Sequence, residues 1–523
     1  MTSRTPITRL PTFRVPLAVL LGAIACWFVF SWTQPAGPGL DPDAVQYVSA
    51  AKSFATHGTF QVPDDSWDSP DSVDPLTHFP PGLSTVLAAP VALGADPLQA
   101  ARVVNGVAAL VAIGMVFLFA SWAEGRVAGT VAAIAVGVTP AVAYVFLDVL
   151  SEPLFFALML VTLACMVWRP RSPLWAGLGA AAAAMVRYAG VSVIAAVGVW
   201  SLLLPGTLRE RVRRAMVALV PGAIALGAWM VRTRLETNGG GIREFKVYGQ
   251  IVPTLDEGVR TLVGWSAPLV GGLWRIAPAI VAACAVLVLA RDAMRRWSVR
   301  ERLSGTWSRA DRSGPPGPPG PRAAFAVAAT LVLAACYVAV VVMARLFADP
   351  GIPLDERLLS PLMLLAIVAI VITLSNGWRV WRRTARIVAA VLLVCWAGAS
   401  AWVTAQEGAY AVDTGNDYAD ESWFGSPLIA WVRDHAAGRE LYTNYPTALY
   451  FHADRWARLM PKAPTPDTAR AFADVVAQTH GLIVAFNRSS RFAASATALM
   501  QLVPPPIHVV VRTHDGAIYE LPR

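Results

Sequence analysis

Charged residues are scarce in this chain: Asp, Glu, Lys and Arg make up only 15% of its 523 residues, against about 25% in an average soluble protein. Hydrophobic residues make up 56%, and the mean hydropathy is +0.52. Disorder requires low hydrophobicity, and one water-soluble core does not accommodate so much apolar sequence. The lack of charge therefore excludes both a disordered chain and an ordinary soluble domain.

Cysteine is also rare, and common motifs of soluble enzymes are missing. The five cysteines all lie inside apolar runs, so none is placed to form a disulfide outside a membrane. The sequence has no CxxC, no HExxH and no Gly-rich phosphate-binding loop. These absences argue against thiol redox, zinc-protease and P-loop nucleotide chemistry.

Long apolar runs are what the sequence has instead. A helix needs about 20 mostly apolar residues to cross about 30 Å of hydrocarbon. Uncharged runs of roughly that length lie at 15–32, 103–122, 127–147, 153–168, 215–231, 323–344, 358–378 and 387–406. Their number predicts a polytopic α-helical membrane protein.

Three further segments are less regular. Residues 172–208 hold one charge, Arg187, and are too long for a single span, so they predict a hairpin of two short helices with Arg187 near its tip. Residues 261–290 predict an interfacial segment that continues into a span. Residues 79–95 contain three prolines, which predicts short helices at the outer surface. The predicted total is about 11 spans.

The placement of charge predicts the orientation. Lys and Arg number 43 and Asp and Glu 34, which gives a net charge of +9. Basic clusters recur in loops that a cytoplasmic N-terminus (1–14) places on the inner side, including the loop at 291–322. The excess positive charge therefore indicates a multi-pass protein of the cell (inner or plasma) membrane and not a nucleic-acid partner.

Composition divides the rest of the chain into a transmembrane domain at 15–404 and a more polar domain at 405–523. Segments 440–444, 482–486, 508–513 and 517–521 predict strands, and segments 466–479 and 492–502 predict helices. The C-terminal part is therefore expected to be a small α/β domain on the extracytoplasmic side.

An acidic outer loop at 34–80 is the first region with candidate functional residues. Its sequence Asp41-Pro-Asp43 opens a predicted helix, in which Asp41 alone satisfies the N-cap and Asp43 lies in the first turn. The run from Asp64 to Asp74 predicts a solvated acidic loop. A divalent cation is left open there as a cofactor, but the spacing is not that of a calcium loop, and no residue is assigned as a metal ligand.

Two further outer regions lie at the ends of apolar runs. Asp148 and Glu152 flank a turn between two runs, where carboxylates are costly and often functional. The alternative is a pair of interfacial helix-end charges. In the third region Asp355 and Glu356 precede an apolar run and are placed to cap a helix, and Arg357 is placed to contact an anion.

A set of motifs recurs in order along residues 15–405. It consists of Asp43 with Tyr47 four residues later, His78-Phe-Pro-Pro-Gly-Leu, Ala100-Ala-Arg102-Val-Val-Asn105, Ser151-Glu-Pro-Leu-Phe-Phe and Asp355-Glu-Arg-Leu-Leu-Ser-Pro361. Together with the N-terminal span, the set resembles the GT-C glycosyltransferases, on the branch of protein O-mannosyltransferases and lipid A aminoarabinose transferases.

The resemblance implies transfer of a hexosyl or pentosyl unit from a polyprenyl-phosphate donor, with inversion, to a glycan, lipid or protein acceptor at the outer face. It makes Asp43 the candidate general base and Asp41 the fallback, because a carboxylate can accept the proton of the attacking hydroxyl. Glu152 matches the second acidic position of the family. With Asp148 and Tyr47 it is expected to orient donor or acceptor.

The leaving group implied by the resemblance is a lipid phosphate, which needs cations. Arg357 and Arg243 rank first because both lie in predicted outer loops, and Arg187 follows. Where aminoarabinose transferases carry a lysine before Pro-Pro, this chain has Phe79, so His78 is the candidate that could contact phosphate when protonated.

Two other functions are compatible with so many spans. One is a membrane polysaccharide polymerase or ligase, and the other is a lipid or sugar transporter. A transporter usually shows internal repeats with broken helices at matching positions, and the sequence shows no such repeat. The glycosyltransferase is therefore the preferred hypothesis.

Overall fold

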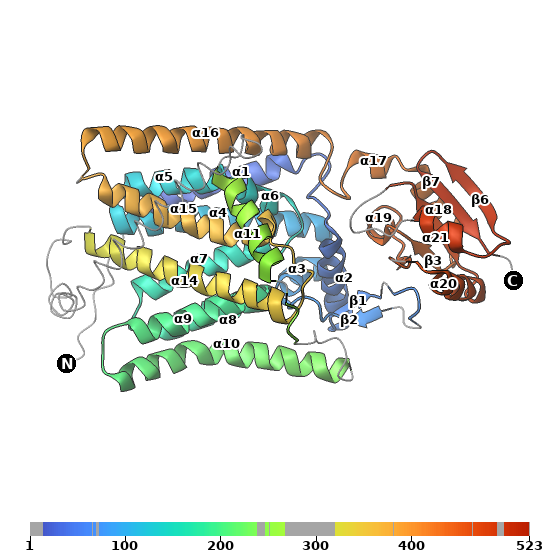
Figure 1. Ribbon diagram of the computed structural model, residues 1–523, viewed down its shortest axis with the longest axis horizontal. Coiled ribbons are helices and arrows are strands. Elements are labelled where there is room, and N and C mark those ends of the chain that lie inside the picture. Colours follow the sequence, from blue (N-terminus) through green and yellow to red (C-terminus); the bar gives the residue numbers. More distant parts are fainter. Residues whose placement is uncertain are drawn as a thin grey trace. The chain divides into compact units, whose positions relative to one another are not determined.

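The computed structural model describes residues 14–64, 66–69, 73–237, 246–249, 251–266, 320–379, 381–462, 464–488 and 496–521. The chain divides into two compact units, coloured along the sequence in Figure 1. The helical unit comprises Met1–Trp32, Thr77–Leu83 and Arg102–Ala409, and the mixed unit comprises Thr33–Leu76, Ser84–Ala101 and Tyr410–Arg523. The predictions for 1–13, 291–319 and most of 261–290 lie outside the described residues.

Apolar runs of the sequence form the helices of the helical unit. These are α1 (Arg14–Trp32), α4 (Pro97–Glu124), α5 (Arg126–Gly137), α6 (Pro140–Leu147), α7 (Glu152–Trp168), α8 (Pro173–Val186), the 3-10 turn η1 (Tyr188–Gly190), α9 (Val191–Leu203), α10 (Leu208–Glu236), α11 (Ile251–Ser266), α14 (Gly320–Phe347), α15 (Glu356–Gly377) and α16 (Arg383–Asp413). Helices α4 and α16 each extend by a few residues into the mixed unit.

Six of the described helices are long and apolar enough to cross a membrane: α1, α4, α10, α14, α15 and α16. The bent pair α5 and α6 passes the same test as a seventh. Helices α7, α8 and α9 are apolar but shorter, with 17, 14 and 13 residues. The multi-pass helical architecture thus agrees with the sequence, and the total of about 11 spans stays a prediction.

The apolar run at 127–147, predicted to form one span, is broken into two helices that together form a broken span or a re-entrant loop. It forms α5 and α6, which meet at an angle of 63°. Pro140 at the start of α6 lacks a backbone N–H and interrupts the helical hydrogen bonds. The carbonyl of Val138 in the break accepts a hydrogen bond from Thr404 Oγ1 at 2.8 Å, which satisfies a backbone group that lipid cannot.

The predicted hairpin at 172–208 is confirmed. Helices α8 and α9 pack against each other and are separated by Arg187, whose backbone is extended with φ −145° and ψ 142°. Gly190 follows the break so closely that a Cβ would come within 2.4 Å of the Ala184 backbone nitrogen. Only glycine fits this close backbone contact without a shift.

Small residues let the helices of this unit approach closely. A Cβ on Gly22 of α1 would lie 2.4 Å from the Leu110 carbonyl oxygen of α4, and one on Gly177 of α8 would lie 2.4 Å from that of Ala218 in α10. Such contacts are typical of helix packing in membranes. Figure 1 shows α8, α9 and α10 as neighbours and α14 beside α15, and residue contacts confirm both arrangements.

The mixed unit begins with α2 (Pro42–His57) and a hairpin of β1 (Gln61–Pro63) and β2 (Val73–Pro75). The segment at 79–95, expected to hold short helices, forms one helix, α3 (Gly82–Ala92), with Pro90 inside it. Its first two residues belong to the helical unit.

The C-terminal part contains five strands in the order β4-β3-β5-β7-β6. They are β3 (Leu441–Thr443), β4 (Arg458–Leu459), β5 (Leu482–Phe486), β6 (His508–Thr513) and β7 (Gly516–Glu520), with helices α17 (Glu421–Phe424), α18 (Pro427–His435), α19 (Pro446–His452), α20 (Pro466–Gln478) and α21 (Ala496–Leu502). The four predicted strands and two predicted helices are confirmed within a few residues. Strand β4 and helices α17, α18 and α19 were not predicted.

Alternation along β5 explains the layers of this domain. Side chains of a strand point to opposite faces in turn. Leu482, Val484 and Phe486 pack with α18 and α19, whereas Ile483 and Ala485 pack with α20 and α21. The sheet is therefore covered by helices on both faces, and all five residues of β5 are buried.

The edge of the sheet at β4 binds the acidic outer loop. The Arg458 guanidinium donates to the carbonyl oxygens of Ser66 and Ser69 at 3.0 and 2.6 Å, and Trp456 Nε1 donates to that of Asp64 at 2.7 Å. Ser66 also pairs with Leu459 as an isolated parallel bridge. Asp64 is only 5% exposed, so the expectation of a solvated loop is wrong at this residue.

Replacing Arg458 with methionine tests this attachment. The side chain is 10% exposed, and its loss leaves two loop carbonyls without their donor, so we expect about 1–3 kcal/mol of destabilisation and faster hydrogen exchange at 61–69. Arg433→Met is the control, because that arginine is 59% exposed. Equal exchange at 61–69 in both variants, measured by mass spectrometry, would contradict the proposed attachment.

Candidate active site

Glu152 lies at the centre of a buried ionic cluster in the helical unit. It opens α7 after Ser151, with Pro153 in the first turn, and it is 1% exposed. A carboxylate in the first turn of a helix is favoured by the positive end of the helix dipole. Burial nevertheless makes an unpaired carboxylate very costly, so this position requires cationic partners.

Two arginines supply these partners. Arg187, at the break between α8 and α9, places Nη1 2.5 Å from Glu152 Oε1 and 3.0 Å from Ser151 Oγ. Arg357, in the first turn of α15, places Nε 2.6 Å from the same Glu152 oxygen. We call Glu152, Arg187 and Arg357 the arginine cluster. The structure thus joins three residues that the sequence had singled out separately.

The arginine cluster carries a net positive charge. Two guanidinium groups share one carboxylate, and their side chains are 16% and 21% exposed, so an anion can still reach them. Arginine forms strong, directional hydrogen bonds to phosphate oxygens. The starts of α7 and α15 add partial positive charge at the same place. The arrangement is suited to binding a phosphate group.

Backbone contacts hold the elements that carry the cluster. Asp355 is the N-cap of α15, since its Oδ1 accepts the N–H of Leu358 at 2.9 Å, which confirms its predicted capping role. Tyr337 Oη donates to the Leu358 carbonyl at 2.6 Å. Before α7, the Asn105 amide donates to the carbonyl of Asp148 at 2.7 Å, and Asp148 is completely buried.

Asp41, Asp43 and Tyr47 lie together on α2 in the mixed unit. Asp41 is the N-cap and its Oδ1 accepts the N–H of Asp43 at 3.0 Å, as the sequence predicted. Asp43 is partly exposed, and Tyr47, one turn later on the same face, is fully buried.

Helix α2 is held by the C-terminal part of its own unit. Leu40 pairs with Asp417 in an isolated bridge and accepts the Tyr418 N–H at 3.3 Å. Burial raises the pKa of Tyr418, and the negative charge of Asp41 acts in the same direction. Lys52 lies 5.4 Å from the centre of the Tyr450 ring.

The remaining predicted phosphate ligands are placed differently. His78 is exposed and follows Thr77, whose carbonyl accepts a hydrogen bond from Tyr188 at 3.1 Å. Because Tyr188 follows Arg187 in the chain, the structure brings the loop before α3 to the break that carries Arg187. Arg243 lies outside the described residues.

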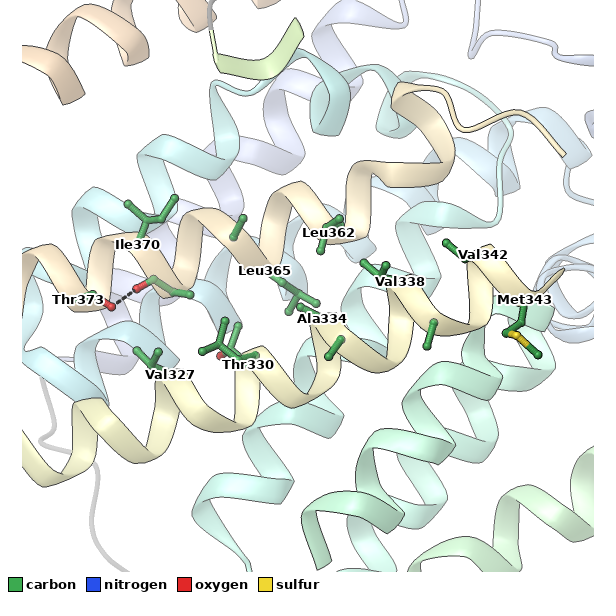
Figure 2. A pocket seen from close by; sticks show the side chains of 15 residues that line it. Val327, Thr330, Ala334, Val338, Val342, Met343, Leu362, Leu365, Ile370 and Thr373 are labelled. Atoms are coloured by element: carbon green, nitrogen blue, oxygen red, sulfur yellow. Dashed lines mark hydrogen bonds between the residues drawn. The ribbon is translucent and has the colours of Figure 1, made fainter. Parts of the chain in front are cut away.

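An open apolar groove of about 700 Å³ runs between α14 and α15, as Figure 2 shows. It is lined from α14 by residues including Ala334 and Val338 and from α15 by residues including Leu362 and Ala366. The hydroxyl of Thr373 donates to the Ala369 carbonyl at 2.7 Å, the dashed line in Figure 2, which leaves the lining apolar.

Two charged residues near the arginine cluster were not predicted from the sequence to be functional. Glu257 of α11 and Arg345 of α14 form a 2.6 Å ion pair beside the start of α15. Neither lies in a recognisable motif, although Arg345, a charge directly after the apolar run at 323–344, was a usable signal. Among the described residues, no three His, Cys, Asp or Glu side chains lie close enough together to hold a metal ion.

No known family model matches the chain, and no curated protein matches its sequence. Its fold is nevertheless shared by solved structures. ArnT from Cupriavidus metallidurans bound to undecaprenyl phosphate has a TM-score of 0.56 over 97% of this chain and 98% of ArnT, at 14% identity. The chain has the fold of ArnT, which is the fold that the GT-C resemblance predicts.

Two further structures with the GT-C fold are similar. The archaeal oligosaccharyltransferase AglB from Archaeoglobus fulgidus, in complex with an inhibitory peptide and a dolichol-phosphate, has a TM-score of 0.53 at 11% identity, over 91% of this chain and 70% of AglB. The arabinofuranosyltransferase AftD from Mycobacteria has a TM-score of 0.53 at 13% identity, over 97% of this chain and 42% of AftD. The fold that the sequence motifs predicted is thereby confirmed.

Proposed function

We propose that this protein is an integral membrane glycosyltransferase that transfers a sugar from a polyprenyl-phosphate donor to an acceptor at the outer face of the cell membrane. The arginine cluster on a GT-C fold carries the proposal, because it offers net positive charge at two helix starts to an anionic group. The ArnT and AglB structures hold undecaprenyl phosphate and a dolichol-phosphate.

The donor phosphate is the leaving group in the proposed reaction. The acceptor hydroxyl oxygen attacks the anomeric carbon from the face opposite the phosphate, and the bond from that carbon to the phosphate oxygen breaks with its electron pair. Arg187 and Arg357 stabilise the phosphate charge that develops. Attack from the opposite face inverts the anomeric configuration.

Asp43 takes the proton of the acceptor hydroxyl in this proposal. A partly exposed carboxylate can act as a general base when the hydroxyl lies within hydrogen-bond reach. Asp41 is already engaged as the N-cap of α2, which favours Asp43. Glu152 orients the donor by fixing both arginines. Asp148 and Tyr47 support the two acidic segments, and His78 and Arg243 are further phosphate ligands.

The groove between α14 and α15 is the proposed binding site of the prenyl chain. It begins at Leu362, five residues after Arg357, which is about 7.5 Å along α15. The groove and Arg357 are therefore within about one and a half turns of the same helix, which suits a chain whose phosphate binds Arg357. The apolar lining matches an isoprenoid hydrocarbon.

A bulky side chain in the groove tests this binding site. We expect Ala366→Trp to raise KM for an undecaprenyl-phosphate donor about fivefold, because the indole occupies space needed by the tail, and to leave KM for a two-isoprene donor unchanged. Val394→Trp on α16 is the control, since Val394 is 69% exposed. An equal rise in KM for both donors would show that the groove does not hold the prenyl tail. A lower Tm with it would show that the indole displaces another part of the chain.

Reconstitution tests the proposed activity itself. The purified chain in liposomes is given polyprenyl-phosphate monosaccharides labelled in the sugar, together with glycan, lipid and peptide acceptors. Formation of labelled acceptor together with free polyprenyl phosphate supports transfer. Movement of the intact donor between leaflets without cleavage would instead identify a transporter, and chain elongation of a lipid-linked glycan would identify a polymerase.

A further inference from the structure

Helix α11 carries two side chains that hold the segment just before α15. Glu257 Oε1 accepts the backbone N–H of Leu354 at 2.8 Å, and Thr261 Oγ1 donates to the carbonyl oxygen of Leu354 at 2.6 Å. Both backbone polar groups of Leu354, which is 4% exposed, are therefore engaged by one helix. These bonds join residues that are 97 and 93 positions apart.

Arg345, near the end of α14, completes the arrangement. Its Nη1 lies 2.6 Å from Glu257 Oε2 and donates to the Ile352 carbonyl at 3.0 Å. Its side chain is 7% exposed, against 39% for Glu257. The ion pair fixes the Glu257 carboxylate so that its other oxygen meets Leu354. We call Glu257, Thr261 and Arg345 the α11 clamp.

The α11 clamp acts close to Arg357 along the chain. Leu354 precedes Asp355, the N-cap whose carboxylate fixes the start of α15, and Arg357 lies in the first turn. The first residues of a helix set the directions of the side chains in its first turn. The position of Leu354 therefore controls how the Arg357 guanidinium is presented to Glu152.

We propose that Glu257, held by Arg345, is a positioning residue for lipid-phosphate binding, because it fixes Leu354 and thereby directs Arg357. The inference rests on the proposed phosphate-binding role of Arg357. It assigns a role to α11, which no sequence motif marked, and it links α14 to the arginine cluster through hydrogen bonds, ion pairs and the backbone from Leu354 to Leu358.

Hydrogen exchange tests the clamp without reference to activity. Glu257→Ala removes the acceptor for Leu354, whereas Glu257→Gln keeps one acceptor oxygen but loses the ion pair with Arg345. The control is Asp256→Ala. Asp256 is a neighbouring carboxylate on the same helix, is 55% exposed and pairs with Arg260. In the full chain, exchange at 352–358 is expected to be about tenfold faster in Glu257→Ala, near wild type in Asp256→Ala, and between the two in Glu257→Gln.

A double-mutant cycle tests the functional link. The affinity for undecaprenyl phosphate is measured on the full chain for wild type, Glu257→Ala, Arg357→Gln and the double variant. Glu257→Ala is expected to weaken binding about tenfold, the size of one lost charge-assisted interaction. If Glu257 acts through Arg357, the double variant binds no more weakly than Arg357→Gln alone.

The outcomes of these two experiments distinguish a failure of the positioning role of Glu257 from a failure of the proposed phosphate-binding role of Arg357. Additive losses, or unchanged exchange at 352–358 in Glu257→Ala, would overturn the positioning role while leaving Arg357 as a phosphate ligand. Wild-type affinity in Arg357→Gln would instead overturn the proposed function of Arg357. Exchange and affinity closer to wild type in Glu257→Gln than in Glu257→Ala support the role of the acceptor oxygen over a general loss of packing.

Discussion

Replacing Asp43 with asparagine is expected to lower the transfer rate by about 10²–10⁴-fold, the usual contribution of a general base. The amide cannot take the proton of the attacking hydroxyl, although it has nearly the same size as the carboxylate. Because Asp41 caps α2 and Tyr47 packs beneath it, the helix remains intact in this variant. The measurement is sugar transfer in liposomes, with the amount of inserted protein and its Tm determined in parallel.

Asp41→Asn provides the matched comparison. Asparagine is as good an N-cap as aspartate, so α2 still begins at the same residue and the position of Asp43 is unchanged. Activity within about tenfold of wild type is expected, because the altered charge lies two residues from the base. If Asp41→Asn is inactive and Asp43→Asn is active, the base is Asp41, the fallback that the sequence left open.

Replacing Arg357 with glutamine is expected to weaken donor binding by about 10- to 100-fold, since a hydrogen bond to a charged group contributes about 1.5–3 kcal/mol. Glu152 keeps Arg187 at 2.5 Å in this variant, so the buried carboxylate is not left unpaired. The effect should therefore appear in donor KM and in the affinity for undecaprenyl phosphate. We expect only a small change in acceptor KM.

Arg260→Gln controls for the loss of one positive charge. Arg260 is 78% exposed and forms a surface pair with Asp256, so its replacement is expected to change donor KM less than twofold. Equal donor affinity in the two variants would place the phosphate away from the arginine cluster. A large fall in Tm for Arg357→Gln alone would show that the residue is structural.

Local elements of this protein were accessible from the sequence. The Asp41 cap, the strand at 482–486 and the hairpin around Arg187 each depend on residues within a few positions of one another. The break between α5 and α6 was also accessible, because Pro140 lies within the run, but the uncharged length of that run outweighed it in the prediction. Periodicity and capping act locally, and sequence patterns record them directly.

Pairings across the fold were not accessible in the same way. Glu152 and Arg357 were each identified as functional candidates, yet they are 205 positions apart, and only the packing of α7 near the start of α15 joins them. Asp64 was assigned to solvent from its residue type, whereas Trp456 and Arg458 determine its burial. A charged side chain shows that a partner is needed, but tertiary structure chooses the partner.

The bonds that attach the outer loop to β4 also order events during biosynthesis. Trp456 and Arg458 follow their partners in the loop, Asp64, Ser66 and Ser69, by 389 to 392 positions. At about 5–20 residues per second of translation, the loop waits roughly 20–80 s for them. Helix α2 and its Asp43 are thus synthesised well before the domain that holds them. A chain whose synthesis stops before β4 lacks the two side chains that attach the loop, so the loop contacts form only after β4 has been made.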